Sequence, residues 1–130
     1  MKKYLYFLFA LTLLTSCQES LEDRAEKDAR EFTRKMCPTP YVNYERTDSC
    51  VFDKSSRTYI YYRDFNDKAD NKEIISKNRK ALRNALIKGI ADSQALRKFK
   101  DAKFRFRYVY RSASTGDVLL DETVSEKDYK

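Results

Sequence analysis

Residues 103–111 carry the most regular pattern in the chain, and this pattern sets the type of fold. Aromatic side chains occupy alternate positions, and the positions between them are mostly basic. The aromatic set is Phe104, Phe106, Tyr108 and Tyr110, and the intervening set is Lys103, Arg105, Arg107, Val109 and Arg111. Successive side chains of a strand point to opposite faces, so a period of two predicts a strand with one buried and one solvated face. The segment therefore predicts a sheet that is covered by helices on one side only.

Periodicity and turn chemistry place the remaining elements. Apolar residues three to four positions apart predict helices, and β-branched or aromatic runs bounded by Asp, Ser and Gly predict strands and turns. The predicted helices are 20–36, 70–91 and 94–100, and the predicted strands are 47–52, 57–65, 103–111 and 118–125. The main elements follow the order helix, strand, strand, helix, strand, strand. We therefore expect an α+β fold in which a four-stranded antiparallel sheet has its helices packed on one face.

The first 17 residues have the layout of an export signal. Lys2 and Lys3 precede an uncharged stretch, 4–14, and Thr15 and Ser16 lead directly to Cys17. The apolar run is about 11 residues long, whereas a membrane-spanning helix needs about 20. The sequence Leu-Thr-Ser-Cys resembles the lipobox of bacterial lipoproteins, which implies cleavage before Cys17 and acylation of this cysteine. An ordinary secretory signal or an uncleaved anchor is the alternative.

This resemblance divides the chain into three parts. We expect residues 1–16 to be a signal peptide, 17–19 a lipidated tether and 20–130 a single α+β domain. More than one acyl chain on Cys17 would make the membrane a stable partner, since each buried CH₂ group contributes about 0.8 kcal/mol. Gln18 follows the cysteine, and by resemblance to lipoprotein sorting signals this disfavours retention in the inner membrane. The sequence therefore predicts an outer-membrane lipoprotein, with the face of that membrane left open.

Two cysteines remain once Cys17 is acylated, because the chain contains three. An even number in an oxidising compartment favours a disulfide between Cys37 and Cys50. The bridge would close a loop of about 14 residues and contribute about 3 kcal/mol in the chain-entropy model. It would join the end of the first helix to the first strand. A buried pair of free thiols and a redox pair are the alternatives.

The composition argues against most kinds of catalysis. The chain has no histidine, so Ser-His-Asp and Cys-His mechanisms and His-ligated zinc are excluded. It has only two glycines, so it cannot form a glycine-rich phosphate loop. We therefore expect a non-enzymatic protein that holds no metal and no cofactor.

The charge of the chain bears on its partners. The net charge is +7, of which the signal peptide contributes two, so the remaining chain carries +5. Both signs are interspersed, which is typical of a solvated surface with a basic bias. Export argues against nucleic acid as a partner, whereas an anionic headgroup, lipopolysaccharide or acidic glycan is accessible.

One surface stands out as a candidate for binding. If the aromatic residues of segment 103–111 pack under the helices, the arginines lie on the open face of the sheet. We expect alternate residues of strand 57–65 to join them there, because this arrangement places Ile60 in the core. The predicted interaction surface is Tyr59, Tyr61, Arg63, Arg105, Arg107 and Arg111. Tyrosine and arginine are enriched at binding hot spots, and guanidinium groups bind carboxylate or phosphate. Alternatively, Thr58, Ile60 and Tyr62 lie beside the arginines, or the arginines pair with Asp121 or Glu122 across the strands.

The order of the elements resembles the αββ repeat of secreted β-lactamase-inhibitor-like domains, and this resemblance implies binding to a protein. The whole chain also resembles small bacterial lipoproteins of unassigned function. We therefore predict a membrane-anchored, non-enzymatic protein-interaction or envelope-structural module. The alternative is an accessory lipoprotein that binds a small ligand, a glycan or a polyanion. Neither the identity of the protein partner nor the oligomeric state follows from the sequence.

Overall fold

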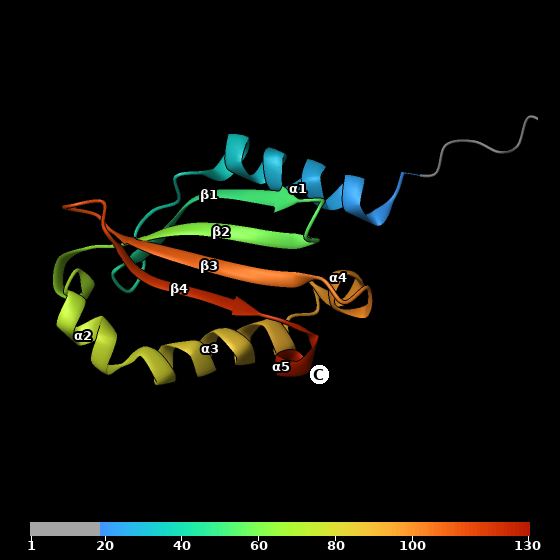
Figure 1. Cartoon of the computed structure of the whole chain (residues 1–130). Helices are drawn as coiled ribbons and strands as arrows, with labels where there is room; N and C mark the ends of the chain where they lie inside the picture. Colours follow the sequence, from blue (N-terminus) through green and yellow to red (C-terminus); the bar gives the residue numbers. More distant parts are fainter. Residues whose placement is uncertain (1–18) are drawn as a thin grey trace, which may run out of the picture.

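The computed structural model of the protein describes residues 19–130 (Figure 1). The predicted signal peptide, 1–16, and the predicted acylation site, Cys17, lie outside the described residues. In chain order the elements are α1 (Leu21–Met36), β1 (Glu45–Asp53), β2 (Thr58–Phe65), the 3-10 helix η1 (Asp67–Ala69), α2 (Lys72–Lys77), α3 (Arg79–Asp92), α4 (Arg97–Asp101), β3 (Arg105–Ser112), β4 (Val118–Val124) and α5 (Glu126–Tyr129). The structure thus confirms the α+β class with four strands.

The four strands form one sheet in the order β1-β2-β3-β4. The two hairpins, β1-β2 and β3-β4, are antiparallel, but the central pair β2-β3 is parallel. The prediction of a fully antiparallel sheet is therefore wrong for this pair. Four helical segments lie between β2 and β3 (Figure 1). These segments return the chain to the end of the sheet at which β2 begins, so that β3 runs parallel to β2. A parallel neighbour requires a crossover of this kind.

Helix α1 follows the predicted pattern closely. Its N-cap is Ser20, whose hydroxyl accepts a hydrogen bond from the backbone N–H of Asp23 at 3.0 Å. Acidic residues fill the first turn, where they stabilise the positive end of the helix dipole. Ala25 and Ala29 are buried against β1. The helix ends at Met36, shortly before Pro38, which cannot continue it.

The long helix predicted over 70–91 is interrupted at Asn78. The side-chain amide of Asn78 donates to the carbonyl of Ile74 at 2.8 Å, and this local bond competes with the regular helical pattern. The segment is therefore divided into α2 and α3. Ile75 of α2 packs with the core residues at one end of the sheet, and Ile90 of α3 packs with those at the other end.

The apolar core lies on the side of the sheet that faces the helices. The alternation predicted for β3 is confirmed on this side, where Phe104 and Phe106 are completely buried, but Val109, which was expected on the solvated face, is buried as well. Tyr108 is half-buried and lies between the two parts of the core, in contact with both. The first part is formed by Ala25, Ala29, Cys50, Phe52, Tyr59, Ile90, Phe99, Phe104, Phe106 and Val124, and the second by Phe65, Ile75, Tyr110 and Leu120.

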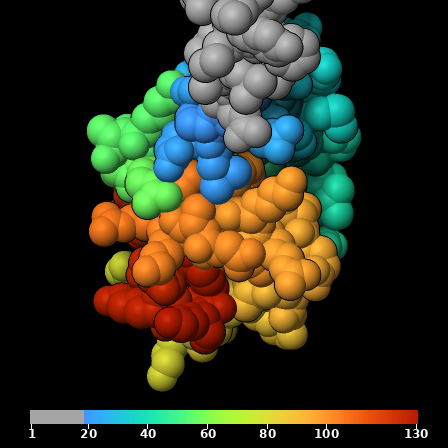
Figure 2. All heavy atoms as spheres, turned by 90° about the vertical axis from the view of Figure 1, so that its right-hand side faces the viewer, coloured from blue at the N-terminus to red at the C-terminus, as the bar shows by residue number. Residues whose placement is uncertain are grey.

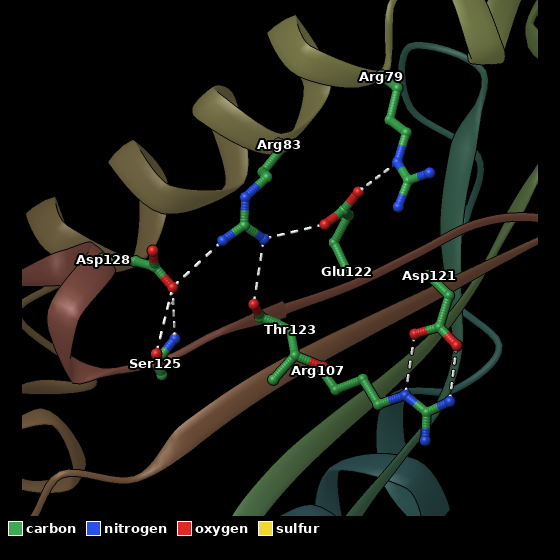
Figure 3. A network of polar contacts seen from close by, with 8 residues as sticks. All are labelled: Arg79, Arg83, Arg107, Asp121, Glu122, Thr123, Ser125 and Asp128. Atoms are coloured by element: carbon green, nitrogen blue, oxygen red, sulfur yellow. Dashed lines mark hydrogen bonds and ion pairs between the residues drawn. The ribbon is translucent and has the colours of Figure 1, made fainter.

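A polar network fastens α3 and α5 to the outer strand β4 (Figure 3). Glu122 of β4 is buried and accepts hydrogen bonds from Arg79 Nε at 2.7 Å and from Arg83 Nη1 at 2.9 Å. Arg83 also donates to the carbonyl of Thr123 at 3.1 Å and forms an ion pair with Asp128 at 3.2 Å. A single arginine thus joins β4, α3 and α5. Within the part of the chain that the structure describes, every helix is too short or too polar to cross a membrane.

Candidate interaction groove

The residues of the predicted interaction surface lie on opposite faces of the sheet. The parallel register places Tyr59 beside Phe106 and Tyr61 beside Tyr108, so these tyrosines lie on the side of the helices, together with Arg63. The prediction that Tyr59, Tyr61 and Arg63 accompany the arginines on the open face is therefore wrong. Tyrosine rings, and not Ile60, fill this part of the helix-facing side. The alternative set, Thr58, Ile60 and Tyr62, lies beside the arginines.

The arginines of the open face are partly engaged by their own neighbours. Arg107 forms a two-bond ion pair with Asp121, with Nε···Oδ1 at 2.9 Å and Nη2···Oδ2 at 2.7 Å. These hydrogen bonds lower the pKa of Asp121. Arg111 lies over the ring of Tyr62, 5.8 Å from its centroid, whereas Arg105 forms no salt bridge within residues 19–130. The cross-strand pairing that was the alternative is thus confirmed for Arg107.

The helix-facing side of the sheet is not fully covered, because a gap remains between the helices that flank it. Helix α1 packs beside β1, and α2 and α3 pack beside β4, so β2 and β3 lie between them (Figure 1). Tyr61 and Tyr108 are half-buried there, with rings stacked at 4.6 Å between centroids. Burial raises the pKa of Tyr108 to about 12, so its hydroxyl stays protonated. The part of this face around Tyr61 and Tyr108 is therefore aromatic and uncharged.

Two adjoining pockets hollow this face at the end away from α4. The first has a volume of about 210 Å³ and is lined by Glu45, Arg63, Leu82, Ala85, Leu86, Tyr110 and Leu120. The second has a volume of about 410 Å³ and is lined by Thr39, Pro40, Val42, Asn43, Glu45 and Arg63. The two pockets share Glu45 and Arg63. We call the two together the Arg63 groove.

Arg63 is held firmly at the junction of the two pockets. Its Nη1 atom pairs with Glu45 Oε1 at 2.8 Å and donates to the hydroxyl of Tyr110 at 3.0 Å. The guanidinium group also lies 5.4 Å from the centroid of the Tyr110 ring. Its Nε atom is buried and has no hydrogen-bond partner within residues 19–130. The Nε–H group is therefore closed off from the groove, whereas the Arg63 side chain as a whole is 22% exposed.

Exposed apolar side chains lie in the groove and on α1. Val42 lines the second pocket and is 64% exposed. On α1, the face that buries Ala25 and Ala29 continues at helical spacing to Phe32 and Met36, which are 36% and 59% exposed. Apolar residues on a helix face that already packs inward are typical of a surface that another chain covers.

The predicted disulfide bridge is not formed. Cys37 and Cys50 are free thiols in the structure. Cys50 lies in the core beside Phe52, and Cys37 is the C-cap of α1. Burial raises the pKa of the Cys50 thiol to about 12, and burial also raises that of Cys37. A reactive cysteine requires a lowered pKa, so neither thiol has the character of a nucleophile. Within residues 19–130, no group of His, Cys, Asp or Glu side chains could hold a metal ion.

The groove could not be recognised from the sequence. The sequence identifies Leu82 and Leu86 as part of an apolar helix face, but no sequence pattern marks Glu45 as a functional residue. Its importance comes from the pairing with Arg63, which depends on the register between β1 and β2. A salt bridge between residues so far apart has no local signal.

Comparison with known proteins places the chain in a family. It belongs to the family described as a domain of unknown function, DUF8479, whose model matches residues 20–120. Residues 1–18 match the lipid attachment site of prokaryotic membrane lipoproteins. The protein is therefore a bacterial lipoprotein that is anchored to a membrane of the cell envelope. A search of the curated proteins finds no match to the sequence.

Three solved structures share the fold. A Pseudomonas aeruginosa protein described as secreted superposes with a TM-score of 0.67 at 12% identity, covering 87% of this chain and 100% of that one. The pilotin EpsS of the Vibrio vulnificus type 2 secretion system gives 0.64 at 15% identity, with coverages of 84% and 91%. The type II secretion pilotin AspS of Vibrio cholerae gives 0.61 at 16% identity, with coverages of 82% and 90%. The resemblance to β-lactamase-inhibitor-like domains finds no support in these likenesses.

Proposed function

We propose that this protein is a non-enzymatic outer-membrane lipoprotein that binds a segment of a protein partner in the Arg63 groove. The observation that carries the proposal is the side chain of Arg63, which lines both pockets and is 22% exposed. A carbonyl or carboxylate oxygen of the partner would accept a hydrogen bond from the exposed part of this guanidinium group. Leu82 and Leu86 would receive its apolar side chains.

The shape of the groove favours a peptide segment over a small molecule. Its first pocket, at about 210 Å³, is smaller than the roughly 300–1,000 Å³ of ligand sites, whereas the second, at about 410 Å³, lies within this range, so shape and not volume distinguishes the two kinds of ligand. The second pocket continues from it past Arg63 toward the exposed Val42. A run of shallow, adjoining pockets with one polar anchor suits alternating side chains of a polypeptide, whose main chain supplies the acceptor.

The likeness to two pilotins of type 2 secretion systems supports a role in the envelope. Anchoring by acyl chains on Cys17 would hold the domain at the membrane, and Gln18 favours the outer membrane. A partner would therefore be met at this surface, not in the cytoplasm.

Site-specific photo-crosslinking in cells tests the proposal. A photo-reactive residue replaces either Val42, which lines the groove, or Val118, which is similarly exposed on β4. We expect one discrete adduct from position 42 and none from position 118. Adducts from both positions, or from position 118 alone, would contradict the proposal.

Arg63→Gln supplies the second arm of this experiment. Loss of a charge-assisted hydrogen bond costs about 1.5–3 kcal/mol, so the adduct from position 42 should fall about tenfold or more. Arg111→Gln is the control, because it removes an arginine from the opposite face. Circular dichroism and urea unfolding would show that both variants remain folded. An adduct that is unaffected by Arg63→Gln would contradict the assigned anchor.

A further inference from the structure

The domain begins almost at its lipid anchor. Three peptide units separate Cys17 from Ser20, the N-cap of α1, and they span at most about 11 Å. The match to a lipid attachment site makes Cys17 the point of anchoring. The end of the domain at which α1 starts must therefore lie against the membrane surface. Figure 2 looks onto this end, where the start of α1 (blue) lies beside the segment around α4 and the start of β3 (orange).

The acidic residues in the first turn of α1 already pair with basic residues of the β1-β2 hairpin. In the first turn of α1, Asp23 pairs with Lys54, and Glu22 pairs with Arg57 at 3.1 Å. Arg57 also donates from Nη2 to the carbonyl of Ala102 at 2.9 Å. One guanidinium group thus joins the start of α1 to the connection between α4 and β3. The two segments are therefore neighbours in space as well as in Figure 2.

The basic residues of α4 and its connection to β3 have no such partners. Arg97, Lys98, Lys103 and Arg105 are all exposed, and none forms a salt bridge within residues 19–130. We call these four residues the α4 patch. Segment 97–105 contains five basic residues and one acidic residue, Asp101. Other acidic groups in this part of the molecule are Asp92, which pairs with Lys88, Glu126, which pairs with Lys130, and Glu19 at the start of the described chain.

Backbone conformation adds a second observation at the same end. Arg57 has φ 53° and Lys103 has φ 64°, both in the left-handed region. Glycine or asparagine occupies this region at less cost than a long basic side chain. Both strained positions nevertheless carry a basic residue, and outliers of this kind tend to gather at functional surfaces.

We infer that the α4 patch docks on the anionic phospholipid headgroups of the leaflet that holds the acyl chains of Cys17. Charge complementarity selects this partner, since basic side chains are attracted to anionic membranes within a Debye length of about 8 Å. The short tether holds the end of the domain that carries the patch close to the membrane surface. Arg63 lies five residues beyond Thr58 on β2, about 17 Å from the docked end. Docking therefore presents the Arg63 groove to the aqueous side.

The test uses the full acylated protein, with its acylation checked by intact mass, in vesicles with and without phosphatidylglycerol. A lipid carrying a gadolinium chelate on its headgroup broadens the NMR signals of amides that approach the surface. We expect the amides of 97–105 to broaden strongly in anionic vesicles and only weakly in neutral ones. Added salt should remove the difference. Equal broadening in both kinds of vesicle would overturn the inference.

Charge-reversal variants distinguish the contribution of the α4 patch to membrane docking from that of the lipid anchor. Lys98→Glu with Lys103→Glu should lower the ratio of docked to undocked protein by about 25-fold or more, since each basic residue near the surface contributes about fivefold. The control is Lys72→Glu with Lys80→Glu, which reverses two exposed lysines on α2 and α3. Broadening that persists in the first variant, or is lost in the control, would overturn the inference. Native protein without acyl groups would overturn its premise, whereas the binding of a partner in the Arg63 groove would be tested independently by crosslinking.

Discussion

The hydroxyl group of Thr33 on α1 engages both hydrogen-bonding groups of the Cys50 backbone on β1. The N–H of Cys50 donates to Thr33 Oγ1 at 2.8 Å, and Thr33 Oγ1 donates to the Cys50 carbonyl at 2.9 Å. Because β1 is an edge strand, its outward groups offer a template for pairing with another chain. Thr33 therefore prevents another chain from pairing with the middle of β1.

Replacement of Thr33 by valine should destabilise the protein and expose this edge. Valine has nearly the same shape but no hydroxyl, so both backbone groups of Cys50 lose their partner. We expect the free energy of unfolding in urea to fall by about 1–2 kcal/mol. Sedimentation should also show concentration-dependent self-association, because the edge is open. Thr33→Ser retains the hydroxyl and is the control; an equal loss in both variants would contradict the role of the hydrogen bonds.

Glu122 should matter more to stability than its neighbour Asp121, although both carboxylates pair with arginine. The side chain of Glu122 is 8% exposed, whereas that of Asp121 is 40% exposed. Glu122→Gln removes the buried counter-charge of Arg79 and Arg83, although Arg83 keeps its ion pair with Asp128, and we expect a loss of about 1–3 kcal/mol in urea unfolding. Asp121→Asn should cost less than about 1 kcal/mol, as is usual for exposed pairs. Similar losses in the two variants would contradict the assigned role of burial.

Local patterns in the sequence were sufficient for much of the fold. The strict alternation of residues 103–111 predicted which face of β3 is buried, and Ser20 followed by acids predicted the start of α1. The proline after Cys37 predicted the end of that helix. These features depend on interactions within one element or one turn, so the sequence alone contains them.

The binding surface could not be predicted in the same way. The face on which Tyr61 lies depends on the register between β2 and β3, and both faces offered aromatic and apolar side chains. The expectation that Ile60 is buried favoured the wrong face. The break at Asn78 and the pairing of Arg63 with Glu45 likewise depend on contacts that are formed only in the folded chain.

Asp128 should contribute stability that is lost in acid. Its carboxylate accepts a hydrogen bond from the backbone of Ser125 and pairs with Arg83, and the first of these contacts is the main cause of its lowered pKa. A lowered pKa in the folded state means that the contribution is present above the ordinary value of 3.8 and is lost as the pH falls below it. Asp128→Asn should therefore reduce the unfolding free energy at pH 7, and the difference from the natural protein should shrink below pH 3.8.

The control for this measurement is Asp117→Asn, which changes an exposed aspartate whose carboxylate makes no ion pair within residues 19–130. Its difference from the natural protein should be small at every pH. A difference for Asp128→Asn that stays constant from neutral pH to acid would show that the effect comes from packing and not from the charge.

The two described thiols should differ in reactivity, because Cys50 is buried while Cys37 is half-exposed at the end of α1. With its pKa raised to about 12, Cys50 is ionised in about one molecule in ten thousand at pH 8, whereas an ordinary thiol is ionised in about a quarter of molecules. We expect iodoacetamide to modify Cys37 first and Cys50 at least about 100-fold more slowly. Intact mass against time would follow both reactions, and urea should make the rates equal. A protein that takes up no label in urea until a reductant is added would instead contain the Cys37–Cys50 disulfide, which would contradict the free thiols of the structure.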